Sequence, residues 1–150
     1  VMALDWLKGN KSCLANPYLS GLFIGITIST RPEQMYRALI EATAFGVKAM
    51  VDTLVDNGVA LDSITAIGGI AVKSPFIVQF LADVLGMDIF VPNLTQACGL
   101  GAAINAAVAS GCWPTLIDAQ KAMCVTEGVK YTASSARDFT GRYARYRNML

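Results

Sequence analysis

A pair of adjacent glycines, Gly68 and Gly69, begins the segment of this sequence that is best suited to bind a charged ligand. Glycine allows positive φ angles and lets a ligand approach the main chain closely. A short apolar run precedes the pair, and Lys73, Ser74 and Pro75 follow it, with the serine and proline typical of a helix start. Ligands of open α/β sheets bind beyond the carboxyl ends of strands, where helix N-termini offer unpaired N–H groups. The segment therefore suits a nucleotide. However, it matches neither a P-loop nor a Rossmann motif, and an ordinary strand-to-helix turn would use glycines in the same way.

Other polar segments give weaker chemical signals. Residues 96–103 place two glycines and two alanines in one expected helix, which indicates close packing or a helix at a domain hinge. Asp5 and Trp6, with Asn10 and Asn16 nearby, have no chemical interpretation on their own. We expect the helical carboxylates to be caps or solvated groups and the basic residues of the last helix to form a solvated face. These residues are Glu33, Glu41 and Asp83, and Arg137, Arg142, Arg145 and Arg147.

The composition excludes several classes of function. The 150 residues carry 12 basic and 11 acidic side chains, and a net charge of +1 gives no basis for binding nucleic acid or an anionic membrane surface. There is no histidine, which excludes a His-dependent catalytic triad within the chain. The cysteines form no CxxC pair, so a zinc site is not expected. They are predicted to be reduced thiols of a cytoplasmic protein, and they are Cys13, Cys98, Cys112 and Cys124.

The apolar content bears on the organisation of the chain. Hydrophobic residues make up 54% of the sequence, above the usual fraction for a soluble domain, which indicates that some apolar surface packs against something outside it. No apolar run is long enough to span a membrane, and the first residues do not resemble a signal peptide. We expect residues 1–150 to be one domain, or part of one, cut from a larger protein.

Apolar periodicity and turn signals predict alternating strands and helices. We expect strands at 21–27, 63–67 and 87–91, and helices at 30–57, 74–85 and 96–110. In the first of these helices, Thr30 and Glu33 have the spacing of a capping box, and Pro32 falls in the first turn. The first 20 residues are expected to be a helix end and a loop. Residues 112–133 are expected to be irregular except for a short helix at 115–123. A last helix, capped by Ser135 and Asp138, carries Phe139, Tyr143 and Tyr146 along one side. This order predicts an α/β layered domain with partly parallel strands.

Taken together, these segments resemble the C-terminal domain of the FGGY family of carbohydrate kinases. Residues 21–26 and 34–41, with seven residues between them, are similar to the family's second signature, from which Leu39 departs. Residues 68–74 resemble its adenosine-binding turn, and residues 96–103 resemble the helix after the last core strand of actin-like ATPase domains. Within the family, the segments at Asp5-Trp6 and at 68–75 are most similar to those of the L-ribulokinases, with Lys11 in place of the usual arginine.

The resemblance implies a ribonuclease H-like, actin-like ATPase domain, the nucleotide-side domain of a sugar kinase, without its N-terminal strands. It implies transfer of the γ-phosphoryl group of ATP, with Mg²⁺, to a ketopentose, L-ribulose above all, in the cytoplasmic pathway of arabinose catabolism and in a homodimeric enzyme. Gly68 and Gly69 are expected to lie against the adenine and ribose. Lys73 and Ser74 are both expected near the rim, and the polar contact to the base is expected to fall on one of these two.

The resemblance also places the catalytic aspartate and most sugar contacts in segments that precede this one, so the chain alone is expected to be inactive. Two alternatives remain open at this point. One is another kinase of the same family, for xylulose, glycerol or another polyol. The other is a non-enzymatic actin-like interaction module in which the glycine turn is purely structural.

Overall fold

The computed structural model describes residues 1–150 and contains two small sheets and six helices. The first sheet is an antiparallel pair of β1 (Met2–Leu4) and β2 (Leu22–Ile24), with Ala3 opposite Phe23. The second has the order β3-β4-β5, formed by β3 (Ile64–Thr65), β4 (Ile89–Pro92) and β5 (Gly128–Tyr131). Strands β3 and β4 are parallel, whereas β4 and β5 are antiparallel.

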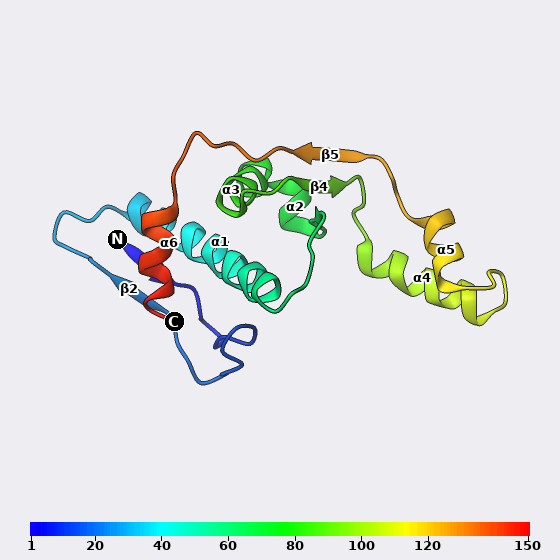
Figure 1. Ribbon diagram of the computed structural model, residues 1–150, viewed down its shortest axis with the longest axis horizontal. Coiled ribbons are helices and arrows are strands. Elements are labelled where there is room, and N and C mark those ends of the chain that lie inside the picture. The colour runs from blue at the N-terminus through cyan, green and yellow to red at the C-terminus, as the bar shows by residue number, and fades with distance from the viewer.

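The helices connect and cover these sheets. They are α1 (Pro32–Asp56), α2 (Gly69–Lys73), α3 (Pro75–Leu85), α4 (Ala97–Ala109), α5 (Leu116–Met123) and α6 (Thr140–Arg147). Figure 1 shows α1, α6 and the β1–β2 pair at one end of the molecule and α4 with α5 at the other, beyond β4 and β5. None of the helices combines the length and the apolar character needed to cross a membrane.

Two clusters of buried side chains hold the elements together. The first joins β1, α1, α3 and α6, with Phe45 of α1 and Tyr146 of α6 at its centre, each 1% exposed. The Phe45 ring centroid lies 5.6 Å from that of Tyr146 and 6.5 Å from that of Phe139. The second cluster joins α2, α3 and β4, with Val78 and Ile89 buried in it. Helix α1 contributes side chains to the first cluster, and its Val47 and Val51 pack against the second, so this long helix connects the two.

The start of α1 lies one residue later than predicted. We expected Thr30 and Glu33 to form the capping pair, but the N-cap is Arg31, whose N–H donates to Gln34 Oε1 at 2.9 Å. Thr30 instead accepts from the N–H of Thr27 at 2.8 Å, which closes the preceding turn. The proline at the first helical position is confirmed.

Three elements were not predicted. The first residues form strand β1 instead of a helix end, because Ala3 and Leu4 are buried against α1. Strand β5 lies in the segment expected to be irregular and pairs with the whole of β4. A five-residue helix, α2, occupies what was expected to be a loop after the glycines. The remaining strands and helices appear where the sequence placed them, with the strands shorter than expected.

The predicted N-cap of the last helix was also wrong. Phe139, not Ser135, is the N-cap of α6, and Asp138 accepts from the N–H of Thr140 at 2.8 Å.

Strand β5 begins with a crowded glycine. Gly128 pairs with Pro92 so closely that a β-carbon on it would lie 2.3 Å from the carbonyl oxygen of Val91. Strand β5 can therefore begin only with glycine.

Candidate functional site

The glycine turn, formed by Gly68 and Gly69, follows β3. It lies at the carboxyl end of this strand, which is parallel to β4. Pairing continues one residue past the strand, since the N–H of Ala66 donates to the carbonyl of Phe90 at 2.9 Å. Gly68 then adopts a φ of +99°, which glycine tolerates far better than other residues, and serves as the N-cap of α2. Gly69 is the first residue of α2, is exposed, and has no heavy atom within 4 Å of the position that a β-carbon would take. The turn thus presents bare main chain to an open space.

Lys73 and Ser74 lie at the other end of α2. Lys73 is its last residue and is exposed, whereas Ser74 is half-buried and links α2 to α3. Ser74 is the N-cap residue of α3 and Pro75 is at the first helical position, as predicted. The serine side chain, however, makes no capping hydrogen bond. Its hydroxyl is therefore available to a ligand. The structure brings the four predicted residues, Gly68, Gly69, Lys73 and Ser74, to the two ends of one short helix.

The carboxylates and thiols are dispersed. No three Cys, Asp or Glu side chains of the chain come together in an arrangement that could hold a metal ion. The chain thus contains no preformed cluster of three ligands for Mg²⁺, an ion that proteins usually bind through one or two carboxylates together with the phosphates of a substrate. The open main chain at Gly69 fits the close approach of a nucleotide, for which bare backbone is needed.

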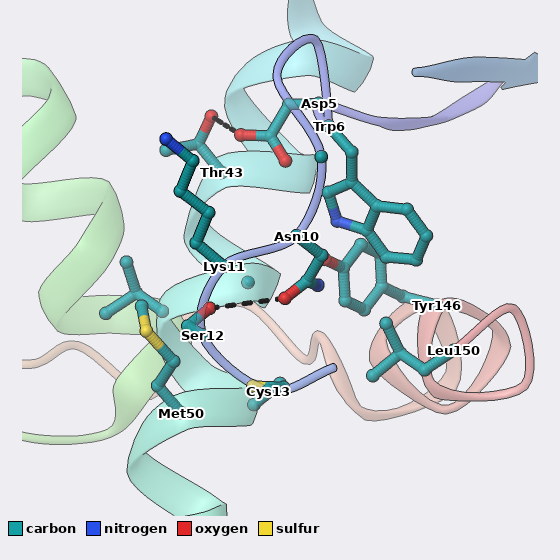
Figure 2. Close-up of a pocket in the computed structure, with 14 residues that line it drawn as sticks. Asp5, Trp6, Asn10, Lys11, Ser12, Cys13, Thr43, Met50, Tyr146 and Leu150 are labelled. Atoms are coloured by element: carbon teal, nitrogen blue, oxygen red, sulfur yellow. Dashed lines mark hydrogen bonds between the residues drawn. The ribbon is translucent and has the colours of Figure 1, made fainter. Parts of the chain in front are cut away.

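A separate polar cavity of about 230 Å³ lies between the N-terminal loop, α1 and the end of the chain (Figure 2). Its lining includes the Asp5 carboxylate, which accepts from the Thr43 hydroxyl at 2.7 Å across 38 residues of sequence. Asn10 is 7% exposed and exchanges two backbone hydrogen bonds with Asn16, at 2.9 and 2.7 Å. Sequence reasoning noted Asp5, Trp6 and Asn10 but missed the cavity, because the partner residue Thr43 lies on a different element.

The loop that carries Asn10 is fixed by a close backbone approach. A β-carbon on Gly9 would lie 2.5 Å from the α-carbon of Pro17, and Gly9 has a φ of +76°. Asn10 Oδ1 accepts from the Leu14 N–H at 3.2 Å, and the Ser12 hydroxyl lies 3.5 Å from the same oxygen. The loop is thus held in place by contacts among its own residues, through the main chain and through the Asn10 side chain.

Glu41 was expected to be a cap or a solvated group, and this prediction was wrong. It is 2% exposed, and its carboxylate accepts from Arg37 Nε at 2.8 Å and from Arg142 Nε at 2.9 Å. Arg142 also donates to the carbonyl oxygen of Val1 at 3.1 Å. The buried acid therefore joins α1, α6 and the start of β1. Its helical spacing from the buried Ala38 and Phe45 is the sequence signal that could have revealed it.

The basic residues of α6 also depart from a plain solvated face. Arg142 pairs with Glu41, and Arg147 Nη1 lies 3.7 Å from the carboxylate of Asp52. The same carboxylate accepts the hydroxyl hydrogen of Tyr143. Burial raises the pKa of the Tyr143 hydroxyl to about 12, and the hydrogen bond to Asp52 acts in the same direction.

Tyr146, one helical turn further on, forms a wall of the cavity. Burial raises the pKa of its hydroxyl to about 12, and the charge of Asp5 adds to this effect, whereas a hydrogen bond with the Trp6 side chain opposes it. Both tyrosines therefore stay neutral well beyond the pH at which an exposed tyrosine ionises.

The comparison with known proteins identifies the family. Residues 1–110 match the model of the FGGY family of carbohydrate kinases, C-terminal domain, and the chain belongs to this family. Among its relatives, the ribulokinase of Vibrio parahaemolyticus is 41% identical over 150 residues, which are 99% of this chain and 26% of that protein. The ribulokinase of Bacillus licheniformis is 46% identical over 111 residues, 74% of this chain and 20% of that protein. The chain thus spans about a quarter or less of the length of these relatives.

The fold agrees with the family. The crystal structure of a xyloylose kinase from Brucella ovis superposes with a TM-score of 0.83 at 21% identity, covering 100% of this chain and 31% of that one. The predicted α/β fold, that of the C-terminal domain of an actin-like ATPase, is confirmed. The predicted likeness to ribulokinases is confirmed as well.

Proposed function

We propose that this chain is the nucleotide-side part of an ATP-dependent sugar kinase that phosphorylates L-ribulose. The observation that carries the proposal is the identity of 41% to 46% with two ribulokinases, one of them matched over almost the whole chain. Since this chain spans about a quarter or less of these relatives, the activity belongs to a longer protein. The isolated chain is expected to be inactive, because no residue in it matches the catalytic aspartate of the family.

Within this proposal, the glycine turn contributes to the ATP site. Gly69 supports it, because its bare main chain faces open space at the carboxyl end of β3. The adenine and ribose lie against Gly68 and Gly69, and the polar contact to the base comes from Lys73 or Ser74 at the far end of α2. Mg²⁺ is held by groups outside this chain. A homodimeric enzyme in the cytoplasm, acting in arabinose catabolism, completes the proposal.

A glycine substitution in the longer protein tests the ATP site. Gly69→Val places a branched side chain where the nucleotide would approach, and the open surroundings let α2 keep its place. We expect the KM for ATP to rise about tenfold or more, equivalent to about 1.4 kcal/mol, with little change in the KM for the sugar. Gly68 is the poorer test position, because its φ of +99° makes any substitution strained.

Gly141→Val is the matched control. Gly141 also lies in the first turn of a helix and has no heavy atom within 4 Å of its β-carbon position. We expect its kinetics to equal those of the unmodified protein. If Gly69→Val leaves the KM for ATP unchanged but alters assembly, the turn is structural and the actin-like interaction module is the better description. Comparison of Lys73→Met with Ser74→Ala then identifies the rim contact.

A substrate panel tests the sugar. The longer protein is assayed for ATP-dependent phosphorylation of L-ribulose, D-xylulose and glycerol, and the highest kcat/KM is expected for L-ribulose. A preference for D-xylulose or glycerol would keep the kinase class and replace the substrate. Absence of phosphorylation with all three would reject the kinase proposal for this protein.

A further inference from the structure

The cavity beside the N-terminal loop contains hydrogen-bonding groups that the proposed ATP site does not use. Asn10 lines it and is 7% exposed. Its Oδ1 is occupied by the Leu14 N–H and the Ser12 hydroxyl, whereas its amide nitrogen donates to no protein atom. No buried side-chain nitrogen or oxygen of the chain lacks a hydrogen-bond partner, so the unpaired Asn10 amide nitrogen is accessible to solvent, and its hydrogens are available to a molecule in the cavity.

An acceptor and a cation lie in the same cavity. Asp5 Oδ2 accepts from Thr43, which leaves Oδ1 free to accept another hydrogen bond. Lys11 forms no ion pair, and Figure 2 shows its ammonium group on the same side of the cavity as Asp5 and Thr43. One negative and one positive group therefore face the same space. They cancel, which disfavours a ligand with a net charge of either sign.

Half of the residues that line the cavity are hydrophobic. Trp6 is 8% exposed and Tyr146 1% exposed, and Figure 2 shows their rings against each other at one wall. Aromatic walls combined with a few fixed donors and acceptors are typical of small-molecule sites. A cavity volume of about 230 Å³ leaves room for a small ligand such as a pentose or pentitol.

We propose that this cavity binds a small neutral polyol, such as a pentitol or pentose. One hydroxyl donates to Asp5 Oδ1, a neighbouring hydroxyl accepts from the Asn10 amide, and the Lys11 ammonium donates to a third at the mouth. The carbon face of the ligand rests on Trp6. The proposal is independent of the kinase activity, because the cavity lies wholly within residues 1–150 and shares no residue with the glycine turn.

Tryptophan fluorescence provides the test. The chain has two tryptophans, Trp6 in the cavity wall and Trp113 in the segment between α4 and α5, so Trp113→Phe leaves Trp6 as the only reporter. The chain with this substitution is titrated with ribitol, L-arabinitol and L-ribulose. We expect a saturable change in the Trp6 emission with Kd values on the order of 1–10 mM, as is usual for a small ligand with few contacts.

Two substitutions localise the binding. Asp5→Ala removes the acceptor and is expected to weaken ribitol binding about tenfold or more. Lys11→Met changes an exposed side chain, so it leaves the fold intact and is expected to weaken binding about threefold to tenfold. Lys8→Met is the control, because Lys8 is equally exposed but does not line the cavity, and it is expected to bind ribitol normally.

The outcomes that overturn the proposal are distinct. No saturable change with any neutral polyol up to about 100 mM would reject the site. Unchanged affinity in both Asp5→Ala and Lys11→Met would place any binding elsewhere. Tighter binding of ribose 5-phosphate than of ribitol would show a site for anionic ligands, and tighter binding of serine would show a site for zwitterions. A failure of the kinase assays leaves these fluorescence results unaffected, so the two proposals fail separately.

Discussion

Helices α1 and α4 are both rich in alanine, but the alanines of α1 are largely buried whereas those of α4 are not. In α1, Ala38, Ala42, Ala44 and Ala49 are all at most 3% exposed, because β1, α3 and α6 pack on this helix. In α4, Ile104 is the only buried residue, and the helix packs mainly on α5. Figure 1 shows α4 and α5 as an arm beyond the sheet. Small residues are buried only where a neighbouring element brings large side chains to them.

The contrast predicts that stability is divided unequally between the body of the fold and this arm, defined as residues 97–123. The body contains both clusters of buried side chains, whereas neither cluster includes a residue of the arm. Elements with few buried apolar contacts open at low free energy. The following substitutions test this division, beginning with the largest expected effect.

Phe45→Ala should have the largest effect. The side chain is 1% exposed and its ring contacts those of three aromatic residues, so its removal leaves a cavity at the centre of the body. We expect the free energy of unfolding, measured in urea, to fall by about 3–5 kcal/mol. Val55→Ala, on the same helix at 53% exposure, should change it by less than about 0.5 kcal/mol. Similar losses for both would contradict the described core.

Glu41→Gln should have the second-largest effect. The amide keeps the shape of the side chain but leaves Arg142 without its charged partner at the junction of α1, α6 and β1. Removing one partner of a buried pair costs about 3–5 kcal/mol, and we expect about 1–3 kcal/mol because both arginines are partly exposed. Urea unfolding checks this, with the exposed Glu33→Gln of the same helix as the control. Equal stability of the two variants would place Glu41 at the surface after all.

Ile104→Ala should act on the arm alone. Ile104 is 5% exposed and is the one buried side chain of α4, so its loss is expected to cost about 2 kcal/mol locally. Hydrogen exchange of the amides in 97–123 should accelerate while the amides of α1 keep their rates. Accelerated exchange in α1 would show that the arm and the body unfold as one unit.

The two tyrosines of α6 give the smallest effect near neutral pH. Their pKa values in the fold are raised from 10 to about 12, so the neutral forms stabilise the fold below pH 10, and this contribution is lost as the pH rises from about 10 to about 12. Tyr146→Phe removes one of the two ionisations. The free energy of unfolding should therefore fall less steeply between pH 10 and 12, as followed by circular dichroism. An unchanged slope would contradict the burial of the Tyr146 hydroxyl.

The sequence predicted the helices and turns that are marked by residues within or next to them. The helix that begins at Pro75 and ends before Gly86 has a proline and a left-handed glycine at its two ends, and its bounds agree with the prediction. The glycine turn was found for the same reason, because two adjacent glycines stand out in any sequence. The resemblance to FGGY kinases rested on several such local motifs together.

What the sequence could not reveal depended on contacts between distant residues. Strand β5 forms because β4 is available to pair with it, and nothing in Gly128 to Tyr131 alone requires a strand. The burial of Glu41 requires Arg142, which lies 101 residues away. The polar cavity likewise requires Thr43 of α1 to meet Asp5. Such pairings are properties of the packed fold rather than of any short segment.

The crowded glycine at the start of β5 has a genetic consequence. Every single-base change in a glycine codon that yields another amino acid adds a β-carbon, and at Gly128 that atom would overlap the Val91 carbonyl and the ring of Phe90. Random mutagenesis should therefore recover almost no functional variants at this codon. Exposed Gly69, with open space around it, should tolerate many of them wherever selection does not demand its ligand.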